Sequence, residues 1–124
     1  NKTLRPLVMY GPVPLSSSLK PITLREVASK VNYIHNDRVL WAKTIHTCHR
    51  MVGTNVLVED DQGGCLMLIL YNLVPASDDP NDYFPEGTFL AILAPYMKNS
   101  CDDPSNSLFL RCDNPECIRL FRLI

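Results

Sequence analysis

The chain has 124 residues, of which 46% are hydrophobic and 20% are charged, and its formal net charge is −1. This length fits one domain that can bury a hydrophobic core without disulfides or metal sites, which usually become necessary only below ~40 residues. The near-neutral charge gives no electrostatic reason for nonspecific nucleic-acid binding. No apolar run approaches the ~18 residues of a transmembrane helix, so we expect no membrane partner.

Cysteine usage and the first residues indicate the compartment. The five cysteines are an odd number at irregular spacing, which argues against a complete disulfide framework. The start, Asn-Lys-Thr-Leu-Arg-Pro, lacks the apolar stretch of a signal peptide, although the missing initiator Met leaves room for an upstream segment. We therefore expect an intracellular protein, in the cytoplasm or nucleus, with reduced cysteines.

Residues 1–19 are predicted to form an extended arm, because they hold three prolines and a run of three serines. Within the arm, residues 7–10 are apolar enough to dock as an edge strand, unless the arm is a linker. Residues 20–124 are predicted to be the folded domain. It begins with a short helix over 23–31, where Thr23 and Glu26 form a capping box.

Three consecutive antiparallel strands are predicted over residues 39–48, 55–59 and 65–71. The first two are rich in β-branched residues, and Asp and Gly in the stretch 60–64 favour a tight hairpin turn between the second and third. The third strand is apolar throughout, which is typical of a strand covered on both faces. We predict Cys48 and Cys65 to be buried in these strands.

The second half of the chain is predicted to close this sheet. The proline-rich, acidic stretch 72–87 reads as a long loop, followed by a fourth strand over 88–96 and a fifth over 107–112. Residues 116–124 indicate a C-terminal helix. Three strands, a long connection and a final hairpin are the order of an OB-fold, a mainly β, five-stranded Greek-key barrel. An open β-sandwich and an SH3-like barrel are the competing interpretations.

No constellation for catalysis or cofactor binding emerges from the sequence. A metal site would need His46, Cys48 and His49, which a regular strand places on opposite faces, or Cys112 and Cys117 with Cys101 upstream. The spacing of the last three cysteines permits zinc or a disulfide, but no second CxxC or paired His accompanies it. The chain contains no G-x-S-x-G, no P-loop and no GxGxxG. We expect no enzyme activity and no cofactor.

Binding is the remaining chemistry, and an OB-fold binds through its strand face and flanking loops. The basic and aromatic residues nearest such a surface are Lys43, Arg50, Tyr71, Tyr96 and Lys98. Stacking on nucleic-acid bases requires exposed aromatic rings. We predict that Trp41 is part of the core instead.

Three stretches, VGTNVLVEDDQGGCLMLILYN, FPEGTFLAILAPYMK and LFLRCDNPECIRLF, carry a family resemblance. They resemble the region preceding the SET domain in fungal and plant proteins that combine tetratricopeptide repeats with a SET domain. The matching motifs are Glu59-Asp60 with Gly63, Tyr71-Asn72, Pro85-Glu86-Gly87-Thr88, Pro95-Tyr96 and Arg111-Cys112-Asp113-Asn114-Pro115. They span a little over half of the chain. Ala94 and Cys117 depart from the family pattern, which has Glu and an aliphatic residue there.

The resemblance implies an accessory module of a protein-lysine methyltransferase. It does not imply the enzyme, because the Asn-His-Ser-Cys-type motif by which SET domains bind the methyl donor is absent from this sequence. Three hypotheses follow. The first is a non-catalytic interaction module that packs on a protein partner or on other domains of its own polypeptide. The second is a single-stranded nucleic-acid binder, and the third is a small zinc-stabilised domain.

Overall fold

One β-sheet carries most of the regular structure. The computed structural model describes residues 4–7, 18–50, 53–71, 74, 76–99 and 108–123. The strands are β1 (Leu4–Leu7), β2 (Lys20–Ile22), β3 (Arg38–Thr44), β4 (His49–Arg50), β5 (Thr54–Asp60), β6 (Cys65–Leu70), β7 (Phe89–Leu93), β8 (Met97–Asn99), β9 (Leu108–Cys112) and β10 (Ile118–Leu123). The helices are α1 (Leu24–Ala28), α2 (Pro80–Tyr83) and the 3-10 turn η1 (Pro115–Cys117). The prediction of a mainly β protein is confirmed.

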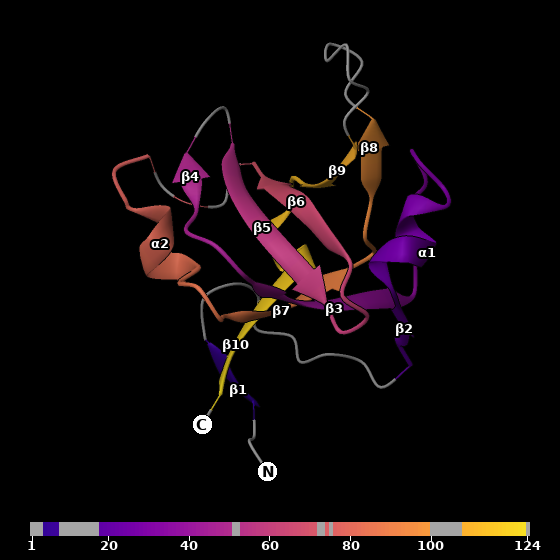
Figure 1. Cartoon of the computed structure of the whole chain (residues 1–124), viewed down its shortest axis with the longest axis horizontal. Coiled ribbons are helices and arrows are strands. Elements are labelled where there is room, and N and C mark those ends of the chain that lie inside the picture. Colours follow the sequence, from indigo (N-terminus) through magenta and orange to yellow (C-terminus); the bar gives the residue numbers. More distant parts are fainter. Residues whose placement is uncertain are drawn as a thin grey trace.

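The strands follow the order β1-β10-β7-β3-β5-β6-β9-β8, with β2 on β3 and β4 on β5 (Figure 1). Strands β1 and β8 lie at the two ends of this path, and no pairing between described strands joins them. The predicted five-stranded closed barrel is therefore wrong, and the sheet is open. The missed strands β2, β4 and β8 have two or three residues each, too few to show an alternation pattern.

The predicted C-terminal helix is also wrong. Residues 118–123 form β10, which pairs antiparallel with β7 on one side and β1 on the other. Ile118 and Leu120 point into the core with 0% and 1% exposure, while Arg119 between them lies on the other face. A six-residue amphipathic run fits either helix or strand, and here the backbone partners on β7 decide the outcome.

The N-terminal helix forms as predicted but is shorter. Thr23 caps α1, its hydroxyl accepting from the Glu26 N–H at 3.1 Å, and the Glu26 carboxylate accepts from the Thr23 N–H at 3.3 Å. The helix ends at Ala28, and Ser29 follows as its C-cap. Leu24 and Val27 insert into the core at 4% and 0% exposure. The capping box thus fixes the end of the helix that delivers these two side chains.

The core lies against one face of the sheet. It gathers alternate residues of the strands, including Leu40, Val56, Val58, Leu68 and Leu90, all fully buried. Phe84, which follows α2 inside the long predicted loop, is buried among them. Elsewhere the first predicted strand ends early, at residue 44, so that residues 45–48 connect β3 to β4. The predicted arm contributes β1, and residues 8–17 of it lie outside the described residues.

Candidate functional site

Strand β6 is apolar on both faces. Leu68 and Leu70 point inward and are buried at 0% and 1% exposure, and Met67 and Ile69 occupy the alternate, outward positions and are half-buried. Antiparallel sheets that face water normally alternate apolar inward and polar outward residues. The outward residues of β6 therefore depart from the pattern of a solvated sheet face.

The outward apolar residues of neighbouring strands continue this surface. Leu57 of β5 pairs with Met67, and the Ile45 N–H donates to the Leu57 carbonyl at 3.1 Å. On the other side of β6, Phe109 of β9 precedes Leu110, which pairs with Leu68. We call this surface the apolar face and define it by five half-buried residues, Ile45, Leu57, Met67, Ile69 and Phe109. It crosses the sheet from the end of β3 to β9.

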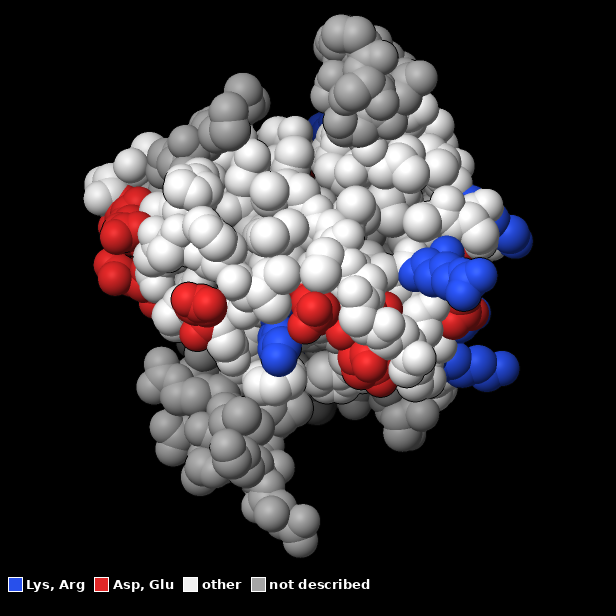
Figure 2. Space-filling model, viewed as in Figure 1, with Lys and Arg blue, Asp and Glu red and all other residues white. Residues whose placement is uncertain are grey.

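Neither described helix covers the apolar face. In Figure 1, α1 and α2 lie at opposite sides of β5 and β6, and neither crosses in front of them. Figure 2 shows, in the same view, a central surface without charged groups, with acidic groups over α2, mainly basic groups near α1, and both acidic and basic groups along its lower margin. Monomeric proteins rarely leave contiguous apolar patches exposed, and such patches commonly mark interaction sites. The apolar face is uncovered by the described helices, and its five side chains are half-buried rather than fully exposed.

Of the five residues predicted to bind a ligand, Tyr71 and Tyr96 lie beside the end of β9, whereas Arg50 on β4 and Lys98 on β8 are four strand spacings, about 19 Å, apart. Tyr71 follows β6, and its N–H donates to the Cys112 carbonyl at 2.9 Å. The Arg111 N–H donates to the Tyr96 carbonyl at 3.0 Å, and Lys98 pairs with Phe109. Arg50 pairs with Thr54, and Thr54 pairs with Leu70, the residue before Tyr71. The structure does not describe the side chain of Arg50.

The Arg111 side chain contacts both Tyr71 and Asp113 at the end of β9. Arg111 was not among the predicted binding residues. Its guanidinium lies 4.7 Å from the centre of the Tyr71 ring and 3.1 Å from a carboxylate oxygen of Asp113. A stacked guanidinium covers one face of an aromatic ring. A nucleic-acid base could therefore stack only on the other face of Tyr71, unless Arg111 moves.

Lys43, the fifth predicted residue, lies elsewhere. It pairs with Glu59, and Glu59 pairs with Cys65 at the start of β6, whereas Tyr71 follows the end of that strand. At roughly 3.3 Å per strand residue, the two ends are about 20 Å apart. The structure therefore separates Lys43 from the other four residues, because β5 and β6 run between them.

Trp41 is not the core residue that we predicted. It is half-buried on the outward face of β3, since the buried residues Leu40 and Ala42 flank it and point inward. Its ring contacts Phe121 of β10, with 5.3 Å between ring centres. Apolar residues at positions 40 and 42 indicate that residue 41 points to the other face of the strand. We predicted a core position because the tryptophan side chain is large and aromatic.

The cysteine and histidine clusters do not form a metal centre in the part of the chain that the structure describes, where no three His, Cys, Asp or Glu side chains gather closely enough. The His46 and His49 rings lie 6.1 Å apart, because the segment between them leaves the strand. Cys112 and Cys117 are free thiols, and Cys101 lies outside the described residues. A zinc site built on Cys112 and Cys117 would need a third protein ligand, and Cys101 is the predicted residue for that position.

The buried thiols are poorly suited to nucleophilic chemistry. Burial raises the pKa of Cys48 to about 11 and that of Cys112 to about 12. Since the thiolate is the reactive form, both groups stay protonated near neutral pH. Cys65, which we predicted to be buried, is exposed at the start of β6. The pKa shifts thus agree with structural roles for the two buried cysteines.

Comparison with known proteins adds no relative: no protein-family model matches the chain, and no curated protein matches it. Among the described residues, no helix is both long and apolar enough to cross a membrane.

Proposed function

We propose that this chain is a non-catalytic interaction module that docks through its apolar face onto a protein surface. The observation that carries the proposal is the outward pair Met67 and Ile69, which makes β6 apolar on both faces while the core covers only one. The polar margin supports it, since Asn55 and Lys98 lie at the border of the face. An apolar centre with a polar rim is the ordinary anatomy of a protein interface.

The docking partner is another domain of the same polypeptide or a separate protein. The motifs that resemble the region preceding a SET domain favour the first, with this chain as an accessory module of a larger SET-domain protein. Three of these motifs fall at corners of the sheet: Glu59-Asp60 ends β5 before the β5–β6 turn, Pro95-Tyr96 lies between β7 and β8, and the motif from Arg111 to Pro115 runs from the end of β9 into the following turn. Such positions fix strand connections, which suits a structural accessory role.

Site-specific photo-crosslinking tests the proposal. A photoreactive amino acid replaces Met67 in the polypeptide as it is expressed, and mass spectrometry identifies the crosslinked peptide. We expect crosslinks to one protein segment, binding of that purified segment to this chain, and at least a tenfold loss of affinity in Ile69→Glu. A photoreactive residue at Glu116, an exposed position in η1 that is not part of the face, is the control. Equal crosslinking from both positions, or no single segment, would refute the proposal.

Single-stranded nucleic-acid binding is the second candidate. It is favoured by Tyr71 and Tyr96, which lie beside the end of β9, and by Lys98 on the neighbouring strand β8. Anisotropy titrations with labelled single-stranded DNA and RNA at low and moderate salt distinguish it from the first. Binding that weakens steeply with salt and is lost in the double variant Lys98→Ala with Tyr96→Ala would establish it. Absence of binding at ~100 μM would eliminate it.

A further inference from the structure

A pocket of about 400 Å³ opens beside the β5–β6 turn, at the other end of the sheet from Tyr71. Trp41 and Phe89 give it aromatic surface, Glu59 and Asp61 give it carboxylates, and Lys43 gives it one ammonium group. Its volume is within the range of about 300–1,000 Å³ that is usual for ligand sites. The pocket lies outside the apolar face and away from the end of the sheet that carries Tyr71 and Arg111.

The aromatic wall of the pocket is held in place by the strands beneath it. Trp41 contacts Phe121 on β10, and Phe89 pairs with Phe121 across the β7–β10 ladder. Trp41 also lines a second hollow of about 230 Å³, which Asp61 borders as well. The indole ring therefore stands between two hollows with a carboxylate group beside both.

The charge of the pocket is negative. The carboxylates of Glu59 and Asp61 and the ammonium of Lys43 leave an excess of one negative charge. The carboxylate of Asp60 is outside this count, because Asp60 lines the pocket but its side chain points to the opposite face of β5 from Glu59. Asp60 is buried at 5% exposure and accepts hydrogen bonds from the backbone N–H groups of Leu24, Gln62 and Gly64, which carry no net charge. Lys43, the ammonium in this count, opposes Glu59 in register. The pocket thus attracts cations.

We propose that this pocket binds an arginine side chain of a partner protein. A guanidinium is planar, stacks on aromatic rings and pairs with a carboxylate through two parallel hydrogen bonds, so it can use Trp41 and the carboxylate of Glu59 or Asp61 together. A lysine ammonium would gain the charge but not the stacking plane. The ammonium group of Lys43 competes with the arginine side chain for the same carboxylates, because it lines the same pocket.

Trp41 is the only tryptophan in the chain, so its fluorescence reports on the pocket directly. The probe is the peptide acetyl-Gly-Arg-Gly-amide, and its matched control replaces arginine by citrulline, which has nearly the same shape without the charge. We expect a saturable change of Trp41 fluorescence with a Kd in the low millimolar range, and at least tenfold weaker binding of the citrulline peptide. Equal binding of the two peptides, or none up to about 10 mM, would overturn the proposal.

Three charge variants sharpen the test. Glu59→Gln and Asp61→Asn should each weaken arginine binding about two- to fivefold, and Lys43→Met should strengthen it by a similar factor, which are typical effects for partly exposed pairs. Glu116→Gln is the distant control and should change nothing. Amide shifts in ¹H–¹⁵N spectra should centre on the pocket in the wild type, and Ile69→Glu should leave them unchanged. Shifts centred on the apolar face, or weakening by Lys43→Met, would contradict the assignment.

Discussion

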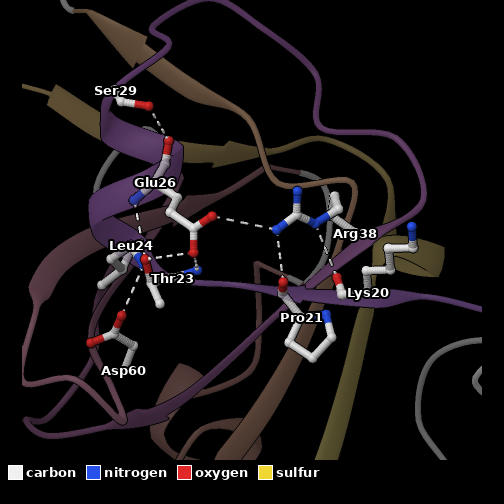
Figure 3. Close-up of polar contacts among 8 residues, drawn as sticks. All are labelled: Lys20, Pro21, Thr23, Leu24, Glu26, Ser29, Arg38 and Asp60. Atoms are coloured by element: carbon white, nitrogen blue, oxygen red, sulfur yellow. Dashed lines mark hydrogen bonds and ion pairs between the residues drawn. The ribbon is translucent and has the colours of Figure 1, made fainter.

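Asp60 ties the turn between β5 and β6 to the first turn of α1. One carboxylate oxygen, Oδ2, accepts from the buried Leu24 N–H at 2.8 Å, and the other, Oδ1, accepts from the Gln62 N–H at 3.2 Å and the Gly64 N–H at 2.8 Å (Figure 3 shows the contact with Leu24). The two oxygens therefore have separate tasks. Substitution with Asn keeps one acceptor oxygen and replaces the other with an NH₂ group, so one of the two sets of hydrogen bonds is lost.

The magnitude follows from that division. Asp60→Asn keeps an acceptor for the turn but presents an NH₂ group to the Leu24 N–H, or the reverse if the amide flips. A hydrogen bond to a charged group contributes about 1.5–3 kcal/mol, and a buried donor without a partner costs about 1–3 kcal/mol. We expect Asp60→Asn to lower the free energy of unfolding by about 2 kcal/mol. Asp60→Ala should lower it by about 3–4 kcal/mol, because water can reach only the turn amides.

Urea unfolding measures both values. With slopes of about 1–3 kcal/mol/M, a loss of about 2 kcal/mol moves the midpoint by about 1 M. The control is Asp61→Asn, which removes the same charge from the exposed neighbouring position and should stay within about 0.5 kcal/mol of the wild type. If Asp60→Asn and Asp61→Asn have equal stability, the hydrogen bonds to Asp60 do not contribute as we argue.

Three further changes have expected outcomes. Gly53→Ala should destabilise the fold by about 1–3 kcal/mol in urea, because the added Cβ would lie 2.7 Å from the Leu70 carbonyl oxygen. Burial, aided by nearby cations, lowers the pKa of His35 from 6.5, so the unfolded state binds more protons below that pH and stability should fall as the pH decreases from about 7 to 5. In a Cys101→Ser background, a maleimide should modify Cys65 in the folded state and Cys48 only on unfolding, because Cys65 is exposed and Cys48 is buried; desolvation and the Glu59 carboxylate raise the pKa of Cys65 and should slow its reaction.

Each of these has its own control. His35→Gln should flatten the stability curve between pH 7 and 5 relative to His46→Gln, since His46 is exposed; parallel curves would contradict the role of His35. For Gly53, Gly63→Ala compares a position where a Cβ meets nothing within 4 Å and only the φ of +83° opposes it. A larger loss at Gly63 would contradict the steric argument. For the cysteines, equal labelling rates of native Cys65 and Cys48 would show that the burial of Cys48 is not maintained.

Local signals in the sequence predicted the parts of the fold whose cause is local. The capping box at Thr23 and Glu26 formed, since it needs only residues three positions apart. The β5–β6 hairpin formed around its Gly-rich turn, where Gly63 adopts a positive φ. Alternation in the predicted strand 55–59 placed Val56 and Val58 on one face, and both are buried.

Long-range pairing decided the rest. The chain alone did not show that residues 118–123 would add to β7, that β1 would pair with β10, or that the sheet would stay open, because each outcome depends on partners distant in sequence. The same holds for the candidate site. The sequence of β6 determined that both faces would be apolar, but only the tertiary structure decided which face the core covers. Burial is a property of what packs against a side chain, so it is settled only when all elements are in place.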